Sequence, residues 1–138
     1  IRGEIELISK STGRSPEEFL GKMPGWVRDN LEVSPYRLSH GQRKWLSIQL
    51  AKTYSPKLLI LDEPTAGLDL ELFNKIVGDI EEYVGENNSV IVLTHDPRLV
   101  ATVSSRCLIL ENHRLREVSV EEGLNYLLEA MGDADFEA

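Results

Sequence analysis

The chain has one cysteine and no long apolar run. Cys107 alone cannot form a disulfide within the chain, a pattern typical of proteins in a reducing compartment. Its surroundings, RCLILEN, predict a strand, so we expect a buried strand thiol rather than a catalytic one. The longest apolar runs, at 58–61 and 90–93, are far too short to cross a bilayer. These absences exclude a disulfide-stapled fold and argue against a membrane-spanning segment.

Positive charge is scarce, and it is unevenly spread. The 138 residues carry a net charge of −8. Residues 1–60 contain ten Lys/Arg against six Asp/Glu, whereas residues 61–138 contain five against seventeen. An acidic chain is a poor non-specific binder of nucleic acid, so we expect no nucleic-acid partner. The basic half suits a small anion, although ordinary solvated faces explain most of these charges.

Helical and strand patterns alternate along the chain, which predicts an α/β fold with a mostly parallel sheet and flanking helices. Residues 1–33 indicate helices broken by Gly and Pro, with Trp26 and Val27 packing locally. A helix then starts at Ser39, with an apolar face of Leu46, Leu50 and Tyr54. The run 58–61 predicts a strand buried on both faces of the sheet.

The second half of the chain continues the alternation. Residues 69–84 predict an amphipathic helix whose apolar face includes Leu72, Ile76, Ile80, Tyr83 and Val84. A second apolar strand follows, and then a short helix in DPRLVATVS. A strand hairpin is expected around 112–113, then a capped helix from 119, and a frayed acidic tail. The apolar residues expected on one face of that last helix are Leu124, Leu127, Leu128 and Met131.

Polar residues follow both apolar strands. Asp62 and Glu63 end the first strand, and His95 follows the second. Sites in open α/β sheets form at the carboxyl ends of strands, so these side chains stand where chemistry is expected. One carboxylate suits Mg²⁺ and the other a nucleophilic water, while the histidine suits a terminal phosphate. A polar strand end followed by a turn, and a histidine without a chemical role, remain open alternatives.

The stretch LSHGQRK, residues 38–44, combines a hydroxyl, a glycine, an amide and two cations. Ser39 and Gln42 match a capping box at a helix start. Arg43 and Lys44 oppose the helix dipole, which costs about 0.3–1 kcal/mol unless an anion lies nearby. With the backbone of Gly41, this helix start suits a phosphate, although a capped surface helix with solvated cations explains the same residues.

In this order and spacing, the motifs resemble the second half of an ABC-type ATPase domain, with a P-loop (RecA-like) fold. The resemblance covers about residues 30–112. Residues 38–42 resemble the signature motif, 58–63 the Walker B motif with its catalytic glutamate, and 66–69 the D-loop. His95 resembles the switch histidine.

The resemblance implies ATP and Mg²⁺ as cofactors, and a head-to-tail dimer with a second ABC ATPase subunit, identical or not. It implies that Asp62 holds Mg²⁺ through water, that Glu63 is the general base, and that His95 contacts the γ-phosphate. It further implies that Asp69 lies at the dimer interface. The residues that it places against the ATP of the opposite subunit are Ser39, Gly41 and Gln42.

Three departures from the family pattern bear on activity. The P-loop G-x-x-x-x-G-K-[ST] does not occur, and the only glutamines are Gln42 and Gln49, so no Q-loop precedes the signature. His40 stands where the family most often has glycine, and it is either a pH-sensitive donor or an outward-pointing side chain. We therefore expect the C-terminal half of a larger ATPase, inactive without an N-terminal half that carries the P-loop.

The expected parts are a remnant of the helical subdomain (1–38), half of the RecA-like core (39–117), and a C-terminal helix with its tail (118–138). SPYRLS and DEPTAGLD resemble the ATPases of cobalt and vitamin importers of the energy-coupling-factor type. This implies a cytoplasmic subunit on the inner face of the cell membrane, contacting a transmembrane partner through residues 1–37. The alternatives are a non-transporter ATPase of DNA repair, chromosome or translation machinery, and a non-catalytic module without a P-loop.

Overall fold

A computed structural model describes residues 1–134, and the last residues of the expected acidic tail lie outside this range. Seven α-helices, one 3-10 helix and four strands form the described part of the chain. Their order is α1 (Arg2–Thr12), α2 (Pro16–Lys22), α3 (Gly25–Asp29), η1 (Pro35–Arg37), α4 (His40–Thr53), β1 (Leu58–Asp62), α5 (Leu70–Gly85), β2 (Ser89–Leu93), α6 (Pro97–Val103), β3 (Cys107–Glu111), β4 (Arg114–Val118) and α7 (Val120–Ala134).

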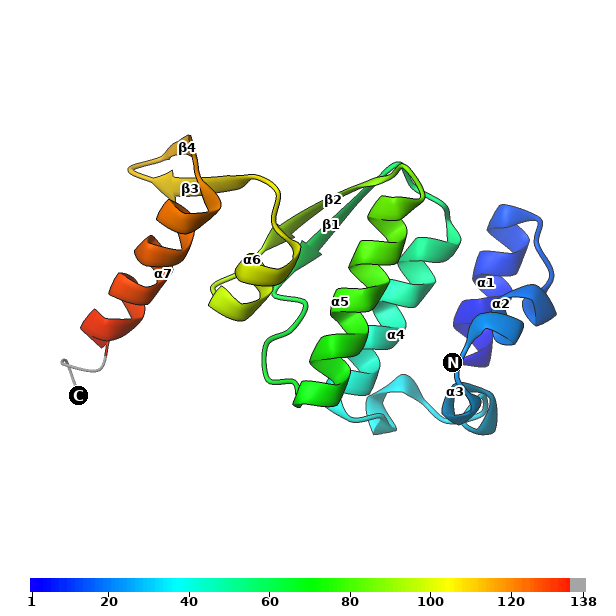
Figure 1. Cartoon of the computed structure of the whole chain (residues 1–138). Coiled ribbons are helices and arrows are strands. Elements are labelled where there is room, and N and C mark those ends of the chain that lie inside the picture. The colour runs from blue at the N-terminus through cyan, green and yellow to red at the C-terminus, as the bar shows by residue number, and fades with distance from the viewer. Residues whose placement is uncertain (135–138) are drawn as a thin grey trace.

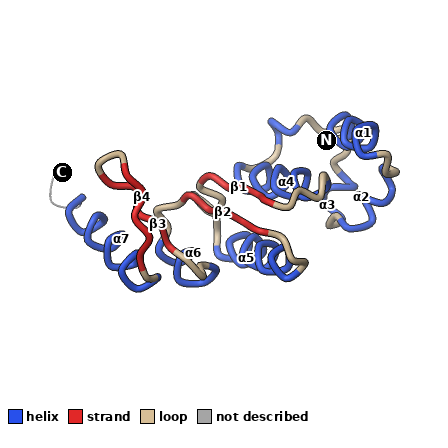
Figure 2. The backbone as a smooth tube through the Cα atoms, turned by 90° about the horizontal axis from the view of Figure 1, so that it is seen from above, coloured by secondary structure: helices blue, strands red, loops and turns tan. Residues whose placement is uncertain are grey.

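The molecule is elongated, with three parts in a row (Figure 1). The short helices α1, α2 and α3 lie at one end, β1 and β2 with α4 and α5 lie in the middle, and the β3–β4 hairpin with α7 lies at the other end. Helix α6 joins the middle part to the hairpin (Figure 2). Within residues 1–134, none of the helices combines the length and apolar character that a bilayer crossing requires.

The parallel pair β1–β2 forms the middle of the fold. Its register places Leu58 opposite Ser89 and Asp62 opposite Leu93, so both strands end at the same edge. Helices α4 and α5 pack against one face and bury Leu59 and Leu61. This face-by-face alternation follows from the two-residue period of a strand.

The expectation that the 58–61 strand is buried on both faces is wrong for this part of the chain. Ile60 is 61% exposed and Ile91 is 49% exposed, on the face opposite α4 and α5. Leu58 and Leu93, on the same face, are also exposed. The reason is that no helix or strand among the described residues covers this face. Its apolar side chains are nevertheless of the kind found on sheets that are covered on both faces.

Trp45 of α4 joins the N-terminal helices to the middle of the fold. Its ring lies 5.7 Å from the ring of Trp26, measured between centroids, so Trp26 packs across the chain and not locally as expected. Its indole Nε1 donates to Asp79 Oδ2 of α5 at 2.7 Å. The same carboxylate accepts from Gln49 at 2.6 Å and from Lys52 at 3.4 Å.

The helix faces agree with the amphipathic pattern, with some shifts. Helix α5 buries Ile76, Ile80 and Tyr83 as expected, but also Phe73 and Val77, while Val84 is exposed. In α4 the expected Tyr54 is 51% exposed because Trp45 and Ile48 form the buried face with Leu46. In α7, Leu128 and Met131 are exposed and Leu124 and Leu127 are half-buried.

The hairpin prediction is confirmed. Strands β3 and β4 are antiparallel, and the two residues between them, Asn112 and His113, have φ of 48° and 61°. Positive φ at both positions is the geometry of a two-residue turn that matches the strand twist. The cap of α7 is confirmed as well, because the Glu122 amide donates to Ser119 Oγ at 3.1 Å. Cys107 is half-buried, beside Gly123.

We predict that Asp79→Ala lowers the free energy of unfolding by about 2–3 kcal/mol, because the buried Trp45 N–H and the Lys52 ammonium lose their acceptor. Urea denaturation measures this change. Glu82→Gln is the matched control: Glu82 pairs with the same lysine at 3.6 Å but its side chain is 70% exposed, so about 0.5 kcal/mol or less is expected. Equal losses for both variants would contradict the assignment.

Candidate functional site

The register of β1 and β2 brings the predicted Glu63 and His95 together. The Glu63 amide continues the strand pairing by donating to the Leu93 carbonyl oxygen at 2.8 Å. Glu63 Oε1 lies 2.6 Å from His95 Nδ1 and accepts the His95 amide at 3.0 Å. Glu63 Oε2 accepts the Thr94 hydroxyl at 3.2 Å. The carboxylate is therefore held at three points by the segment that follows β2.

This pairing leaves both side chains accessible. The Glu63 side chain is 30% exposed and the His95 side chain is 73% exposed. Since Nδ1 of His95 faces the carboxylate, Nε2 is free to meet a ligand. A carboxylate and an imidazole in such an arrangement can orient a water molecule and contact an anion beside it.

Glu63 adopts an unusual backbone conformation, with φ of +44°. The left-handed region disfavours residues with a Cβ by roughly 1–2 kcal/mol, so neighbouring contacts must stabilise it. One of these contacts comes from α4, since Lys44 Nζ donates to the carbonyl oxygens of Glu63 and Ala66. Lys44, one of the two cations expected to oppose the helix dipole unless an anion lies nearby, thus binds carbonyl oxygens of its own chain. Arg43 similarly donates to the Tyr36 carbonyl oxygen at 3.1 Å.

A second set of polar contacts supports the loop after β2. Thr65 is fully buried, and its hydroxyl donates to Asp96 Oδ2 at 3.2 Å. The Asp96 amide donates to Thr94 Oγ1 at 3.0 Å, which joins this set to Glu63. Asp96 also caps α6 through the Arg98 amide. The motifs did not point to Thr65, Thr94 or Asp96 as supports of the site, although DPRLVATVS predicted the helix that Asp96 caps.

The Arg98 guanidinium binds both oxygens of Asp96, at 3.0 and 2.8 Å. These hydrogen bonds are the main reason that the pKa of Asp96 lies below its usual value, and burial opposes the shift. The pKa of Arg98 is raised by the same pair. Asp96 is thus a charged support of the loop that carries His95.

Asp62 ends β1 with an exposed carboxylate, one residue before Glu63. Within residues 1–134, no three or more His, Cys, Asp and Glu side chains gather as a metal site. Mg²⁺ keeps several waters and needs only one or two protein carboxylates, so a single exposed aspartate at a strand end fits it. The described residues therefore fit a magnesium ion held largely by water and a ligand.

The predicted signature residues lie at the start of α4. The capping box is confirmed: the Gln42 amide donates to Ser39 Oγ at 3.1 Å, and the Ser39 amide donates to Gln42 Oε1 at 3.0 Å. The Ser39 hydroxyl accepts in this box and keeps its own proton to donate. His40 is exposed. The capped start of α4 is therefore intact despite the histidine.

Close packing favours glycine at position 41, independently of the ligand contact predicted for it. A Cβ at this position would lie 2.9 Å from Leu68 Cδ2 and closer still to Leu72 Cδ2. The glycine thus lets the start of α4 approach the start of α5. Asp69 lies next to that contact and caps α5, with Oδ1 accepting the Leu72 amide at 2.9 Å. The predicted residues therefore form two groups, one around Glu63 and one at the helix starts, and Lys44 links them.

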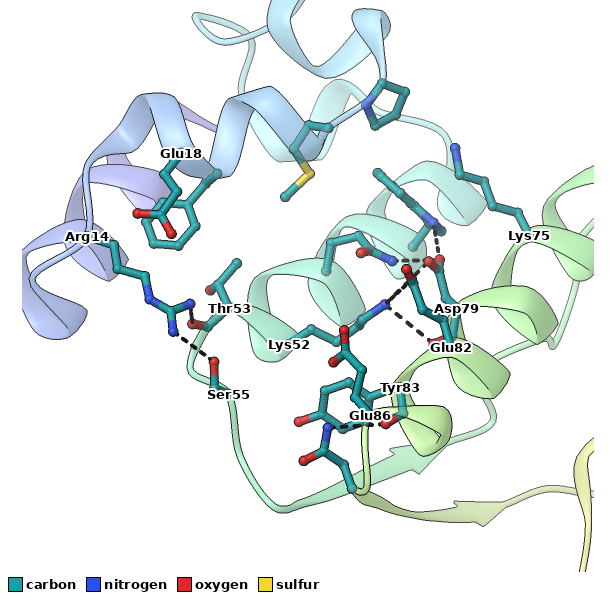
Figure 3. A pocket seen from close by; sticks show the side chains of 16 residues that line it. Arg14, Glu18, Lys52, Thr53, Ser55, Lys75, Asp79, Glu82, Tyr83 and Glu86 are labelled. Atoms are coloured by element: carbon teal, nitrogen blue, oxygen red, sulfur yellow. Dashed lines mark hydrogen bonds and ion pairs between the residues drawn. The ribbon is translucent and has the colours of Figure 1, made fainter.

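A cavity of about 730 Å³ lies elsewhere, between α2 and the paired helices α4 and α5 (Figure 3). Lys52 points across it toward Asp79 and Glu82, and Arg14 points toward Thr53 and Ser55. Lys52 is already paired with the two carboxylates, and none of the residues predicted from the motifs lines the cavity. The strand ends and helix starts remain the candidate site.

Comparisons with known proteins agree with the motifs. A sequence family described as "AAA domain, putative AbiEii toxin, Type IV TA system" matches residues 9–101. The chain is similar to the phosphate import ATP-binding protein PstB of Aeropyrum pernix, with 41% identity over 66% of this chain and 36% of the relative. It is also similar to the energy-coupling factor transporter ATP-binding protein EcfA2 of Ligilactobacillus salivarius, with 32% identity over 81% of this chain and 41% of the relative.

A solved ATP-binding subunit of an ABC transporter has the same fold, with a TM-score of 0.69 at 20% identity over 95% of this chain and 61% of that chain. The predicted fold class, a partial ABC ATPase domain, is therefore confirmed. The chain spans less than half the length of the two curated relatives.

We predict that the stability contributed by the Asp96 charge disappears in acid. Because its folded pKa is lowered, this contribution is complete above the unfolded pKa, near 4, and is lost as the pH falls through the folded value. Asp96→Asn should lower the free energy of unfolding by about 1 kcal/mol at pH 6 and by much less near pH 3. Urea denaturation across this range measures the difference.

Glu117→Gln provides the control for the Asp96 prediction. The pKa of Glu117 is also lowered by an arginine, Arg106, but both side chains are more than half exposed. Solvent screening should leave this variant within about 0.5 kcal/mol of the natural protein at either pH. A pH-independent loss in Asp96→Asn would show that the charge has no part in the support.

Proposed function

Because the chain belongs to the AAA domain family and to the ABC-type ATPases, we propose that it is the C-terminal half of the ATP-binding and ATP-hydrolysing subunit of an ABC transporter. The observation that carries this proposal is the Glu63–His95 pair, 2.6 Å apart at the ends of two parallel strands. In this function the subunit couples ATP hydrolysis in a head-to-tail dimer to transport across a membrane. We propose the three parts that the motifs indicate. They are a remnant of the helical subdomain (1–38), half of the RecA-like core (39–117), and a C-terminal helix with its tail (118–138).

Glu63 is the general base in this proposal. Its carboxylate is fixed by His95 and Thr94, yet it stays partly open to solvent, so it can accept a proton from an attacking water. His95 holds the carboxylate through Nδ1 and presents Nε2 to the γ-phosphate. Both roles use the same pair, whose side chains are in contact in the structure.

Asp62 holds Mg²⁺ through water in this proposal. When bound, the ion neutralises charge on the phosphates. The Asp62 carboxylate lies one residue from Glu63, whose own carboxylate is directed at Thr94 and His95, so the two acids can serve a metal and a water separately.

The helix starts form the surface for the second subunit. Ser39 keeps a hydroxyl proton to donate, and Gly41 keeps the backbone of α4 open to a close approach. Together with Gln42 they would contact the ATP held by the opposite subunit, with the positive end of α4 directed at its phosphates. Asp69, at the adjacent start of α5, would lie in the dimer interface.

The remaining partners follow from the same proposal. The apolar sheet face around Ile60 and Ile91 suits an N-terminal half that carries the P-loop and covers this face. Residues 1–37 would contact a transmembrane subunit, and the proposed location is the cytoplasmic side of the cell membrane. The similarity to an energy-coupling factor ATPase supports an importer of that type.

We expect Glu63→Gln in the full-length protein to abolish steady ATP turnover and to trap an ATP-bound dimer, since glutamine cannot accept the proton. Phosphate release measures turnover, and size-exclusion chromatography with ATP measures the dimer. Loss of about 100-fold or more in kcat is the expected scale for a general base. Turnover at the natural rate would show that Glu63 is not the base.

The 138-residue chain by itself should show no measurable ATP binding. The P-loop supplies the main phosphate cradle, and its motif is absent from the sequence. Isothermal titration calorimetry with MgATP tests this expectation, with the full-length protein as the positive control. A micromolar dissociation constant for the chain alone would refute it.

A further inference from the structure

Lys44 lies in the first turn of α4 and connects this helix to the loop that follows β1. Its ammonium donates to the Glu63 carbonyl oxygen and, at 3.4 Å, to the Ala66 carbonyl oxygen. The side chain is half-buried. Neither of these acceptors is a carboxylate, so the lysine here binds the main chain of a loop rather than neutralising a charge. An ammonium withdrawn from water in this way needs such acceptors in return.

Glu63 is a residue that needs such a restraint. Its left-handed backbone, with φ of +44°, is disfavoured for a side chain with a Cβ. The strand β2 holds the peptide before it, because the Glu63 amide donates to the Leu93 carbonyl oxygen. Lys44 holds the peptide after it. With both peptides fixed, the carboxylate is directed at Thr94 and His95.

We propose that Lys44 is a positioning residue for Glu63, acting through the carbonyl oxygens of Glu63 and Ala66. This inference rests on the proposed function, because it concerns the orientation of the base in ATP hydrolysis. Lys44 extends from the same helix start that carries Ser39 and Gly41. It therefore links the surface offered to the second subunit's ATP with the base that serves the chain's own ATP.

The test uses the full-length protein. Lys44→Met removes the ammonium and should lower kcat about 100-fold, the expected scale for a displaced catalytic group. The KM and the dissociation constant for MgATP should stay within about threefold, since Lys44 is assigned no nucleotide contact. Lys44→Arg should restore kcat to within about tenfold, because a guanidinium can donate to both carbonyl oxygens.

Lys52→Met is the matched control. Lys52 is a second half-buried lysine on α4, but it points toward Asp79 and Glu82 of α5 (Figure 3), whereas Lys44 binds the Glu63 loop. This variant should destabilise the fold at least as much as Lys44→Met, yet keep kcat within about twofold. Equal losses of kcat in the two variants would trace the effect to general destabilisation and overturn the proposal.

Hydrogen–deuterium exchange gives a readout that does not depend on activity. In Lys44→Met the amides of residues 63–68 should exchange about tenfold faster, while those of β2 stay unchanged. If this variant does not fold, Lys44→Gln replaces it: its shorter amide cannot reach both oxygens, so kcat at least about tenfold below that of Lys44→Arg is expected. Equal kcat values for Gln and Arg would overturn the proposal.

Glu63→Gln separates this inference from the function on which it rests. If Glu63→Gln is inactive while Lys44→Met keeps kcat within about twofold of the natural protein, Lys44 does not position the base and the proposed function stands. If Glu63→Gln turns over ATP normally, the proposed function fails and the positioning role fails with it.

Discussion

The parallel pairing of β1 with β2 is the constraint on which the candidate site depends. Because Asp62 lies opposite Leu93, the residues that follow the two strands leave the sheet at the same edge. A shift of one residue in this register would turn the buried Leu59 and Leu61 to the open face. The burial of these leucines against α4 and α5 therefore fixes the register, and the register brings Glu63 to His95.

The sequence predicted the contacts that depend on chain order and strand period. The meeting of Glu63 and His95 follows from two apolar strands with polar ends, and the cap at Ser39 follows from local spacing. It did not predict Lys44, Thr65 or Asp96 as supports, because the contacts that join them across the fold span 19 or more residues and form no short motif. The packing of Trp26 on Trp45 was missed for the same reason.

The prediction that β1 is buried on both faces was wrong for a different physical reason. A continuous apolar run indicates that both faces of a strand need to be covered, but it does not indicate which segment of the protein covers each face. The run at 58–61 has the composition of a covered strand, and Ile60 is nevertheless 61% exposed among the described residues. The apolar pattern thus indicates a face that needs a cover, and this chain spans less than half the length of the two curated relatives.

The left-handed backbone of Glu63 costs stability, whereas its carboxylate makes the contacts of the candidate site. Glycine would adopt φ of +44° without a Cβ penalty, so a chain selected for stability alone would favour it at this position. Glycine has no carboxylate, however, and the contacts to Thr94 and His95 would vanish with it. A glutamate in this conformation thus combines a strained backbone with a side chain that is held in place, and the position is less stable than it would be with glycine.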